Sequence, residues 1–166
     1  MIFPVPVEEN YFDGTYRLQS VCSYKSFFEF YKAVDDHSQD FTFTVNSRYA
    51  EEEYSITVND GGVHIEHSCD VGKFRAVTSL YQLLTDEKEL SYCCIHDKPQ
   101  FSKRGYMLTV GTHYYSGAIP TVERICKCID MLAFMKCNEF QLYIDDFSYK
   151  YEAYPQYTES YDCLTS

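Results

Sequence analysis

A strand–helix–strand pattern between Phe101 and Asp146 constrains the fold of this chain more than any other feature. The apolar runs 104–110 and 140–144 are typical of buried strands, and residues 120–136 between them carry apolar side chains at helical spacing. Pro120 suits the first turn of such a helix, because its missing N–H has no intrahelical partner there. The pattern predicts a βαβ unit with two parallel strands.

The crossover helix is expected to bury one apolar stripe and to end close to Asn138, since Asn tolerates the left-handed conformation that ends many helices. The stripe consists of Val122, Ile125, Ile129, Leu132 and Ala133.

The loops that leave the carboxyl ends of the two strands are the predicted seat of chemistry, as in other parallel α/β folds. The second loop begins with the carboxylate pair Asp145 and Asp146, and the first contains His113. The pair is either a functional pair or a solvated loop start that caps the next element. His113 is either a ligand contact or an exposed loop residue.

The preceding residues predict a small α+β domain over residues 1–97, followed by a second part over 98–166. Residues 1–14 are expected to be irregular. Alternating or short apolar runs predict strands at 15–22, 41–45, 54–58, 63–67 and 91–95, and helical stripes lie at 23–34 and 72–84. The turn Asn59-Asp60-Gly61-Gly62 predicts a hairpin. The expected domain is a mostly antiparallel sheet with helices on one face.

Composition excludes several classes of partner. The chain has 166 residues and a formal charge of −11, which argues against nucleic acid and anionic membranes, because phosphate binding requires clustered Lys and Arg. No apolar run is long enough to span a membrane. The amino terminus lacks the pattern of a secretory signal, and the eight cysteines form no Cys-x-x-Cys pair. We therefore expect a cytoplasmic protein with reduced thiols.

No metal or cofactor site is predicted. His64 and Glu66 share one face of their strand, whereas His67 points to the other face, so the three side chains cannot converge on one ion. The chain contains no Gly-rich phosphate loop and no serine nucleophile elbow.

Specific residues at the join of the two parts resemble a known family. Asp97-x-Pro99-x-Phe101-x-x-Arg104-Gly105 runs into the first strand, and Lys136-x-Asn138 precedes the second. This order resembles the start of the catalytic barrel of glycoside hydrolase family 20, the β-N-acetylhexosaminidases. Residues 54–84 resemble the small α+β domain that precedes that barrel. The resemblance implies that residues 98–166 are the opening βαβ of an incomplete (β/α)8 TIM barrel.

The resemblance also implies an activity. The family removes terminal N-acetylhexosamine from glycans with retention, and the sugar's own acetamido oxygen is the nucleophile. The partner implied is therefore an N-acetylhexosamine-containing glycan, with no cofactor. The Asp-Glu pair that assists the family's reaction lies at the fourth barrel strand. Asp86-Glu87 is the one such pair here, and it lies in the first domain. We therefore expect no catalytic residue and no turnover in this chain.

Two departures from the family pattern keep alternatives open. Thr109 and Thr112 stand where the family has an Asp and an Arg that clamp the terminal sugar. Asp146, or Asp145 in a rival alignment, falls where the family has an acidic residue supporting the catalytic Glu. The chain is thus a hexosaminidase fragment, a non-catalytic carbohydrate-binding or regulatory relative, or a truncated product without a role of its own. Unpaired barrel edges predict self-association.

Overall fold

The computed structural model describes residues 2–19, 26–35, 39–110 and 120–144. It divides into two compact units, Met1–Ser102 and Lys103–Ser166. Each unit is described by itself.

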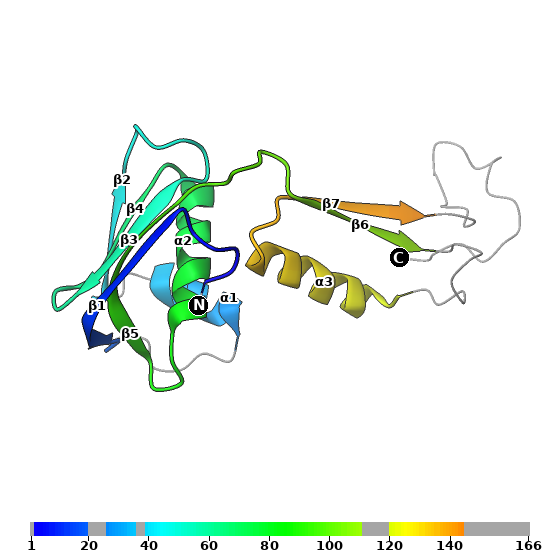
Figure 1. The fold of residues 1–166 in the computed structure, drawn as a ribbon. Coiled ribbons are helices and arrows are strands. Elements are labelled where there is room, and N and C mark those ends of the chain that lie inside the picture. The colour runs from blue at the N-terminus through cyan, green and yellow to red at the C-terminus, as the bar shows by residue number, and fades with distance from the viewer. Residues whose placement is uncertain (1, 20–25, 36–38, 111–119, 145–166) are drawn as a thin grey trace, which may run out of the picture. The chain divides into compact units, whose positions relative to one another are not determined.

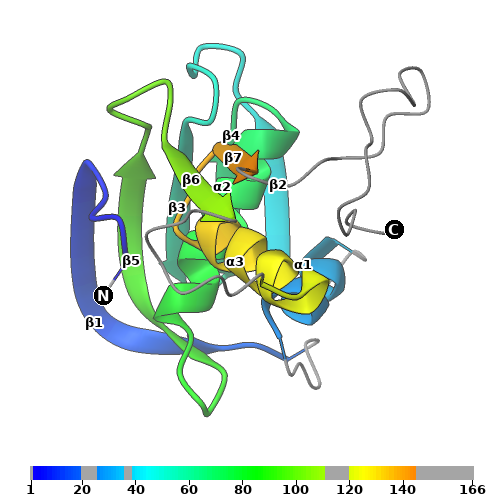
Figure 2. The ribbon, with the colours of Figure 1, turned by 90° about the vertical axis from the view of Figure 1, so that its right-hand side faces the viewer.

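The first unit is a five-stranded sheet with two helices on one face (Figure 1). Its elements are β1 (Glu8–Arg17), α1 (Phe27–Asp35), β2 (Phe41–Val45), β3 (Tyr54–Asn59), β4 (Gly62–His67), α2 (Asp70–Leu83) and β5 (Glu89–Asp97). The strands lie in the order β1-β5-β3-β4-β2, which Figure 2 shows from left to right. All neighbours are antiparallel except β2 and β4, which are parallel. The predicted mostly antiparallel sheet is therefore present.

The β3–β4 hairpin is where the turn sequence predicts it. Gly61 donates its backbone N–H to Asn59 Oδ1 at 2.8 Å, and Gly62 has φ of 116°. A Cβ at Gly62 would lie 2.9 Å from the backbone oxygen of Asp40, so both conformation and space require glycine there.

Strand β1 contradicts the prediction for the start of the chain. Residues 1–14 were expected to be irregular, yet β1 spans Glu8–Arg17 and pairs with β5. Nearly every residue of β1 is exposed, and its register shifts between Tyr11 and Thr15. The strand exists because β5 offers it an edge, and an exposed edge strand leaves no alternating apolar pattern in the sequence.

The core of the first unit lies between the sheet and its helices. The rings of α1 contact those of α2: Phe27 lies 5.4 Å from Phe74, and Phe30 lies 5.5 Å from Tyr81, measured between centroids. The fully buried apolar side chains come from both layers and include Phe30, Ile56, Ile65, Leu80 and Ile95.

The second unit is a βαβ element made of β6 (Gly105–Val110), α3 (Val122–Phe134) and β7 (Glu139–Ile144). The two strands are parallel, as predicted. Thr121 caps α3, since its hydroxyl accepts the backbone N–H of Arg124. No described helix is long and apolar enough to cross a bilayer.

The apolar stripe of α3 is less buried than predicted. Of its described residues only Leu132 is buried, whereas Val122 is 77% exposed and Ile129 is 42% exposed. A sheet of two strands is too narrow to cover a helical stripe of this width. The sequence pattern therefore indicates more packing partners than the described residues provide.

The end of α3 corrects a second expectation. The left-handed residue is Lys136, with φ of 60°, and not Asn138. The N–H of Lys136 bonds to the carbonyl of Ala133, and that of Cys137 to the carbonyl of Leu132. These two bonds form a Schellman motif, which places the left-handed residue two positions earlier than expected.

Candidate functional site

The carboxyl ends of β6 and β7 lie side by side. Their register runs from Gly105 opposite Glu139 to Val110 opposite Ile144, so both strands end at the same level. The chain segments that follow Val110 and Ile144 therefore start from adjacent backbone positions. This edge is where parallel α/β folds bind ligands.

The predicted site residues Asp145, Asp146 and His113 all lie outside the described residues, as does Thr112. Thr109 is described: it is exposed and lies opposite Tyr143 in the parallel pair. The supporting roles of the two carboxylates and of His113 stay predictions.

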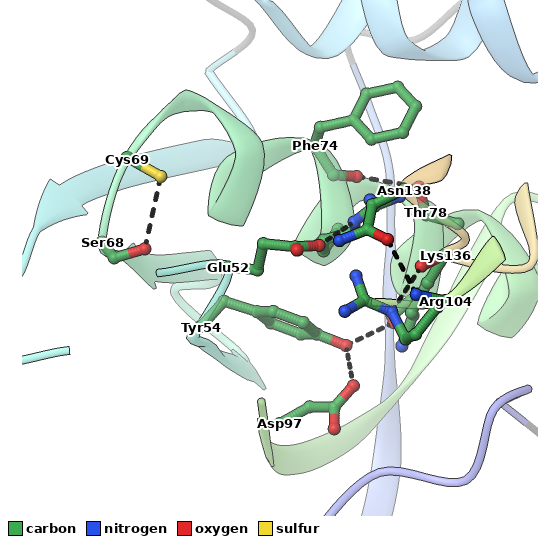
Figure 3. Close-up of polar contacts among 12 residues, drawn as sticks. Glu52, Tyr54, Ser68, Cys69, Phe74, Thr78, Asp97, Arg104, Lys136 and Asn138 are labelled. Carbon is green, nitrogen blue, oxygen red and sulfur yellow. Dashed lines mark hydrogen bonds and ion pairs between the residues drawn. The ribbon is translucent and has the colours of Figure 1, made fainter. Parts of the chain in front are cut away.

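The amino ends of the same strands are held by the residues that the sequence motif singled out. Arg104 donates its backbone N–H to Asn138 Oδ1 at 2.9 Å, and its carbonyl accepts the N–H of Asn138 at 3.0 Å. The Arg104 Nε also donates to the carbonyl of Lys136 at 2.9 Å (Figure 3). These bonds fix the β6–β7 register at the end away from the candidate site, so Arg104 and Asn138 have a structural role.

A buried polar cluster in the first unit surrounds Tyr54, at the start of β3. The Tyr54 hydroxyl donates to Asp97 Oδ2 at 2.8 Å (Figure 3). It also shares a 2.7 Å hydrogen bond with Ser79 Oγ. Burial, together with the Asp97 carboxylate, holds the pKa of Tyr54 well above its usual value. The phenol therefore stays a neutral donor that joins β3 to α2 and to the end of β5.

Glu52 and Arg75 form an ion pair inside the same unit. The Arg75 Nε donates to Glu52 Oε2 at 2.7 Å, and the two side chains are only 7% and 9% exposed. Glu52 has φ of 64°, the left-handed region that non-glycine residues adopt at some energetic expense. Such a pair is costly to break, because removing one partner leaves the other charge buried.

Glu53 makes a separate polar contact, on the face of the sheet opposite to the Tyr54 cluster. Its Oε1 lies 2.8 Å from Nε2 of His96, and its Oε2 accepts the backbone N–H of Ala50. The Ala50 N–H is the largest cause of a lowered pKa for the Glu53 carboxyl, and His96 and Lys98 lower it further against an opposing effect of burial.

The stability contributed by Glu53 is expected to depend on pH. Because the folded-state pKa is lowered, the contribution is complete above the ordinary glutamate pKa and is lost as pH falls through the lowered value. Urea unfolding of the chain and of Glu53→Ala, from about pH 7 to about pH 3, measures it. The difference in free energy of unfolding between the unmodified chain and Glu53→Ala should become smaller as the pH falls. If this difference is constant across the pH range, the charge of the Glu53 carboxylate contributes nothing to stability.

Sequence reasoning missed this cluster, although two signals for it exist. Arg75 falls in phase with the buried residues Gly72, Ala76 and Ser79 of α2, which is an unusual place for a charge without a partner. The acidic run 51–53 directly before a strand supplies that partner. The pairing itself depends on the backbone turn at Glu52, which no periodicity reveals.

The side chains of His64, Glu66 and His67, which could suggest a metal site, do not converge. His64 Nε2 lies 3.7 Å from Glu66 Oε1, while His67 is buried on the opposite face and its Nδ1 lies 3.0 Å from the carbonyl of Cys69. Within the described residues, no group of three His, Cys, Asp or Glu side chains is arranged to hold a metal ion, and no disulfide forms.

The sequence pair Asp86-Glu87 lies in the exposed turn between α2 and β5.

Comparison with known proteins identifies the first unit. Residues 17–98 match the family described as glycosyl hydrolase family 20, domain 2. A β-hexosaminidase of Porphyromonas gingivalis is 34% identical over 122 residues, covering 66% of this chain and 15% of that protein. A β-hexosaminidase of Vibrio furnissii is 28% identical over 115 residues, covering 68% of this chain and 18% of its relative. The chain thus spans less than one fifth of the length of these relatives.

Solved structures extend the likeness across both units. The structure of an inactive mutant of the family 20 exo-β-N-acetylglucosaminidase from Vibrio harveyi matches with a TM-score of 0.73 at 25% identity, over 95% of this chain and 28% of that one. The Flavobacterium johnsoniae chitobiase has the same fold, with a TM-score of 0.73 at 20% identity and 95% of this chain covered. Residues 17–98 therefore belong to glycosyl hydrolase family 20 as its domain 2, and the chain is similar to an N-terminal part of that family's proteins.

Proposed function

We propose that this chain is the N-terminal part of a β-N-acetylhexosaminidase, in which the second unit opens a (β/α)8 barrel. One observation carries the proposal: a family 20 domain 2 is followed directly by a parallel βαβ element, and likeness to the Vibrio harveyi enzyme spans 95% of the chain. In that reading the domains are residues 1–97 and 98–166.

The exposure of the second unit supports a barrel that further elements complete. In a closed parallel barrel every strand has two neighbours, but β6 and β7 have only each other among the described strands. Large apolar side chains of both strands and of α3 are exposed, among them Tyr106, Met107, Ile129, Met131, Leu142 and Tyr143. These are the side chains that neighbouring strands and helices would cover.

The proposed substrate of the complete protein is a glycan ending in β-linked N-acetylhexosamine. N-acetylglucosamine is the sugar bound in one Vibrio harveyi structure, and a curated relative from that organism is an N,N'-diacetylchitobiase. Hydrolysis would proceed through the acetamido group of the substrate. Asp146 or Asp145, which follow β7, would support the catalytic Glu supplied by the rest of the barrel, and His113 would lie in the first loop of the site.

The experiment starts from the coding sequence beyond Ser166. We expect it to encode the remaining barrel strands and an Asp-Glu pair. The extended protein should hydrolyse a chromogenic N-acetylglucosaminide, and the 166-residue chain should not. Sedimentation of both proteins is the matched measurement: the short chain should self-associate through its exposed apolar side chains, and the extended protein should do so less.

Other outcomes separate the alternatives. Hydrolysis by the 166-residue chain alone would contradict the proposal that its catalytic residues lie elsewhere. A stop codon directly after Ser166, with a chain that binds N-acetylglucosamine, would instead establish the non-catalytic binding protein. Thr109, at the position of the family's sugar clamp, is the observation that favours this second candidate.

A further inference from the structure

Side chains hydrogen-bond to the carboxyl end of β5 on both faces of the sheet. His96 and Asp97 are consecutive in β5, so their side chains point to opposite faces. In the register with β3, Asp97 lies opposite Tyr54 and His96 lies opposite Ser55. Tyr54 binds Asp97 on the face covered by the helices, and Glu53 binds His96 on the open face.

The Tyr54 and Glu53 side chains that make these bonds are themselves held by further hydrogen bonds. Tyr54 as a whole residue is 1% exposed, and its hydroxyl is also bonded to Ser79 in α2. The Glu53 carboxylate accepts the backbone N–H of Ala50 through its second oxygen. Two preorganised groups, from Glu53 just before β3 and from Tyr54 at its first position, therefore meet two consecutive residues of β5. Pairing of the strands does not require these side-chain contacts.

We propose that Glu53 and Tyr54 form a two-sided clamp that sets the position and direction in which the chain leaves β5. The residues that follow, 98–102, are exposed or half-exposed, so burial does not fix their course. The clamp holds the residue from which this connection starts, Asp97. This gives a physical reason for an Asp at the head of the sequence motif that ends at Gly105.

The connection that starts at Asp97 leads to β6 of the second unit, which begins at Gly105. The clamp is a positioning element of the first unit, and its identification uses only contacts within that unit. The statement that it positions a barrel strand rests on the proposed function.

Backbone amide exchange of the full chain tests the clamp. Tyr54→Phe removes the hydroxyl on one face, and Glu53→Ala removes the carboxylate on the other. Each variant should raise exchange at residues 94–102 by roughly three- to tenfold relative to the amides of β3 and β4. The double variant should raise it further, because both halves hold the same strand end.

The matched control is Tyr16→Phe. The Tyr16 hydroxyl donates to Asp40 Oδ1 at 2.8 Å, so this variant removes a Tyr–Asp bond of the same length at the other end of β5. It should leave the relative exchange of residues 94–102 unchanged. The proposal is overturned if Tyr54→Phe raises exchange evenly over all five strands, or if Tyr16→Phe has the same effect at residues 94–102.

This readout needs no hydrolysis, so the two proposals fail independently. If the extended protein hydrolyses the N-acetylglucosaminide but Tyr54→Phe and Glu53→Ala leave amide exchange unchanged, the clamp alone is refuted. Local opening in a chain whose extended form is inactive would refute the proposed function alone.

Discussion

Arg75→Met is expected to lower the free energy of unfolding of the first unit by about 3–5 kcal/mol. Methionine fills a similar volume, so the loss comes from the charge that the substitution leaves behind. Glu52 would stay buried without the guanidinium that now lies 2.7 Å from its carboxylate. Exchange of the most protected amides of β3 and β4 under native conditions measures this free energy, because those amides open only with the whole unit.

Two controls isolate the buried charge. The Lys127–Glu123 pair of α3 has the same 2.7 Å separation but its side chains are 73% and 77% exposed. Glu123→Ala should therefore lower the free energy of unfolding of the second unit, measured by exchange of the amides of β6 and β7, by no more than about 0.5 kcal/mol. Replacing both Glu52 and Arg75 by methionine should recover a large part of the loss, because no unpaired charge is left. If the double variant is as unstable as the single one, an unpaired buried charge is not the cause.

Phe30→Ala should destabilise the same unit by about 3–5 kcal/mol. The ring is fully buried, and it joins α1 to α2 through Tyr81 and to β2 through Phe41, at centroid distances of 5.5 and 6.5 Å. Truncation removes this apolar burial and leaves a cavity that rigid neighbours cannot close. The same amide-exchange measurement on β3 and β4 gives the loss.

Phe28 provides the control within the same helix. Its side chain is 45% exposed, so Phe28→Ala removes the same atoms with much less burial lost. We expect a loss of no more than about 1.5 kcal/mol there, less than half of the loss at Phe30. Equal losses at the two positions would mean that α1 does not pack against α2 and β2 through Phe30.

The clamp and the candidate site would have different roles in the proposed function. Asp145 and Asp146 would act on the substrate through residues that a complete barrel supplies. Glu53 and Tyr54 act within the first unit, where they hold the end of β5 from which the connection to the second unit starts. A variant such as Tyr54→Phe therefore perturbs the end of β5 and changes no residue of the candidate site.

The sequence by itself determined the features that depend on neighbouring residues. Strict alternation placed β2, β3 and β4, and the Asn59–Gly62 turn placed their hairpin, because the pleat and the turn impose local rules. Helical spacing located α3 between two parallel strands. The motif around Arg104 and Asn138 indicated the family, and the structure shows that these two residues hold the strands in register.

Only the tertiary structure decided the features that depend on distant partners. Strand β1 exists because β5 offers it an edge, and Val122 is exposed because two strands cannot cover the stripe of α3. The contacts of Arg75, His96 and Asp97 join side chains more than twenty positions apart in the chain. Spacing along a sequence carries no record of such pairs. The packing of α2 on the sheet brings Arg75 to its partner, and the pairing of β3 with β5 brings His96 and Asp97 to theirs.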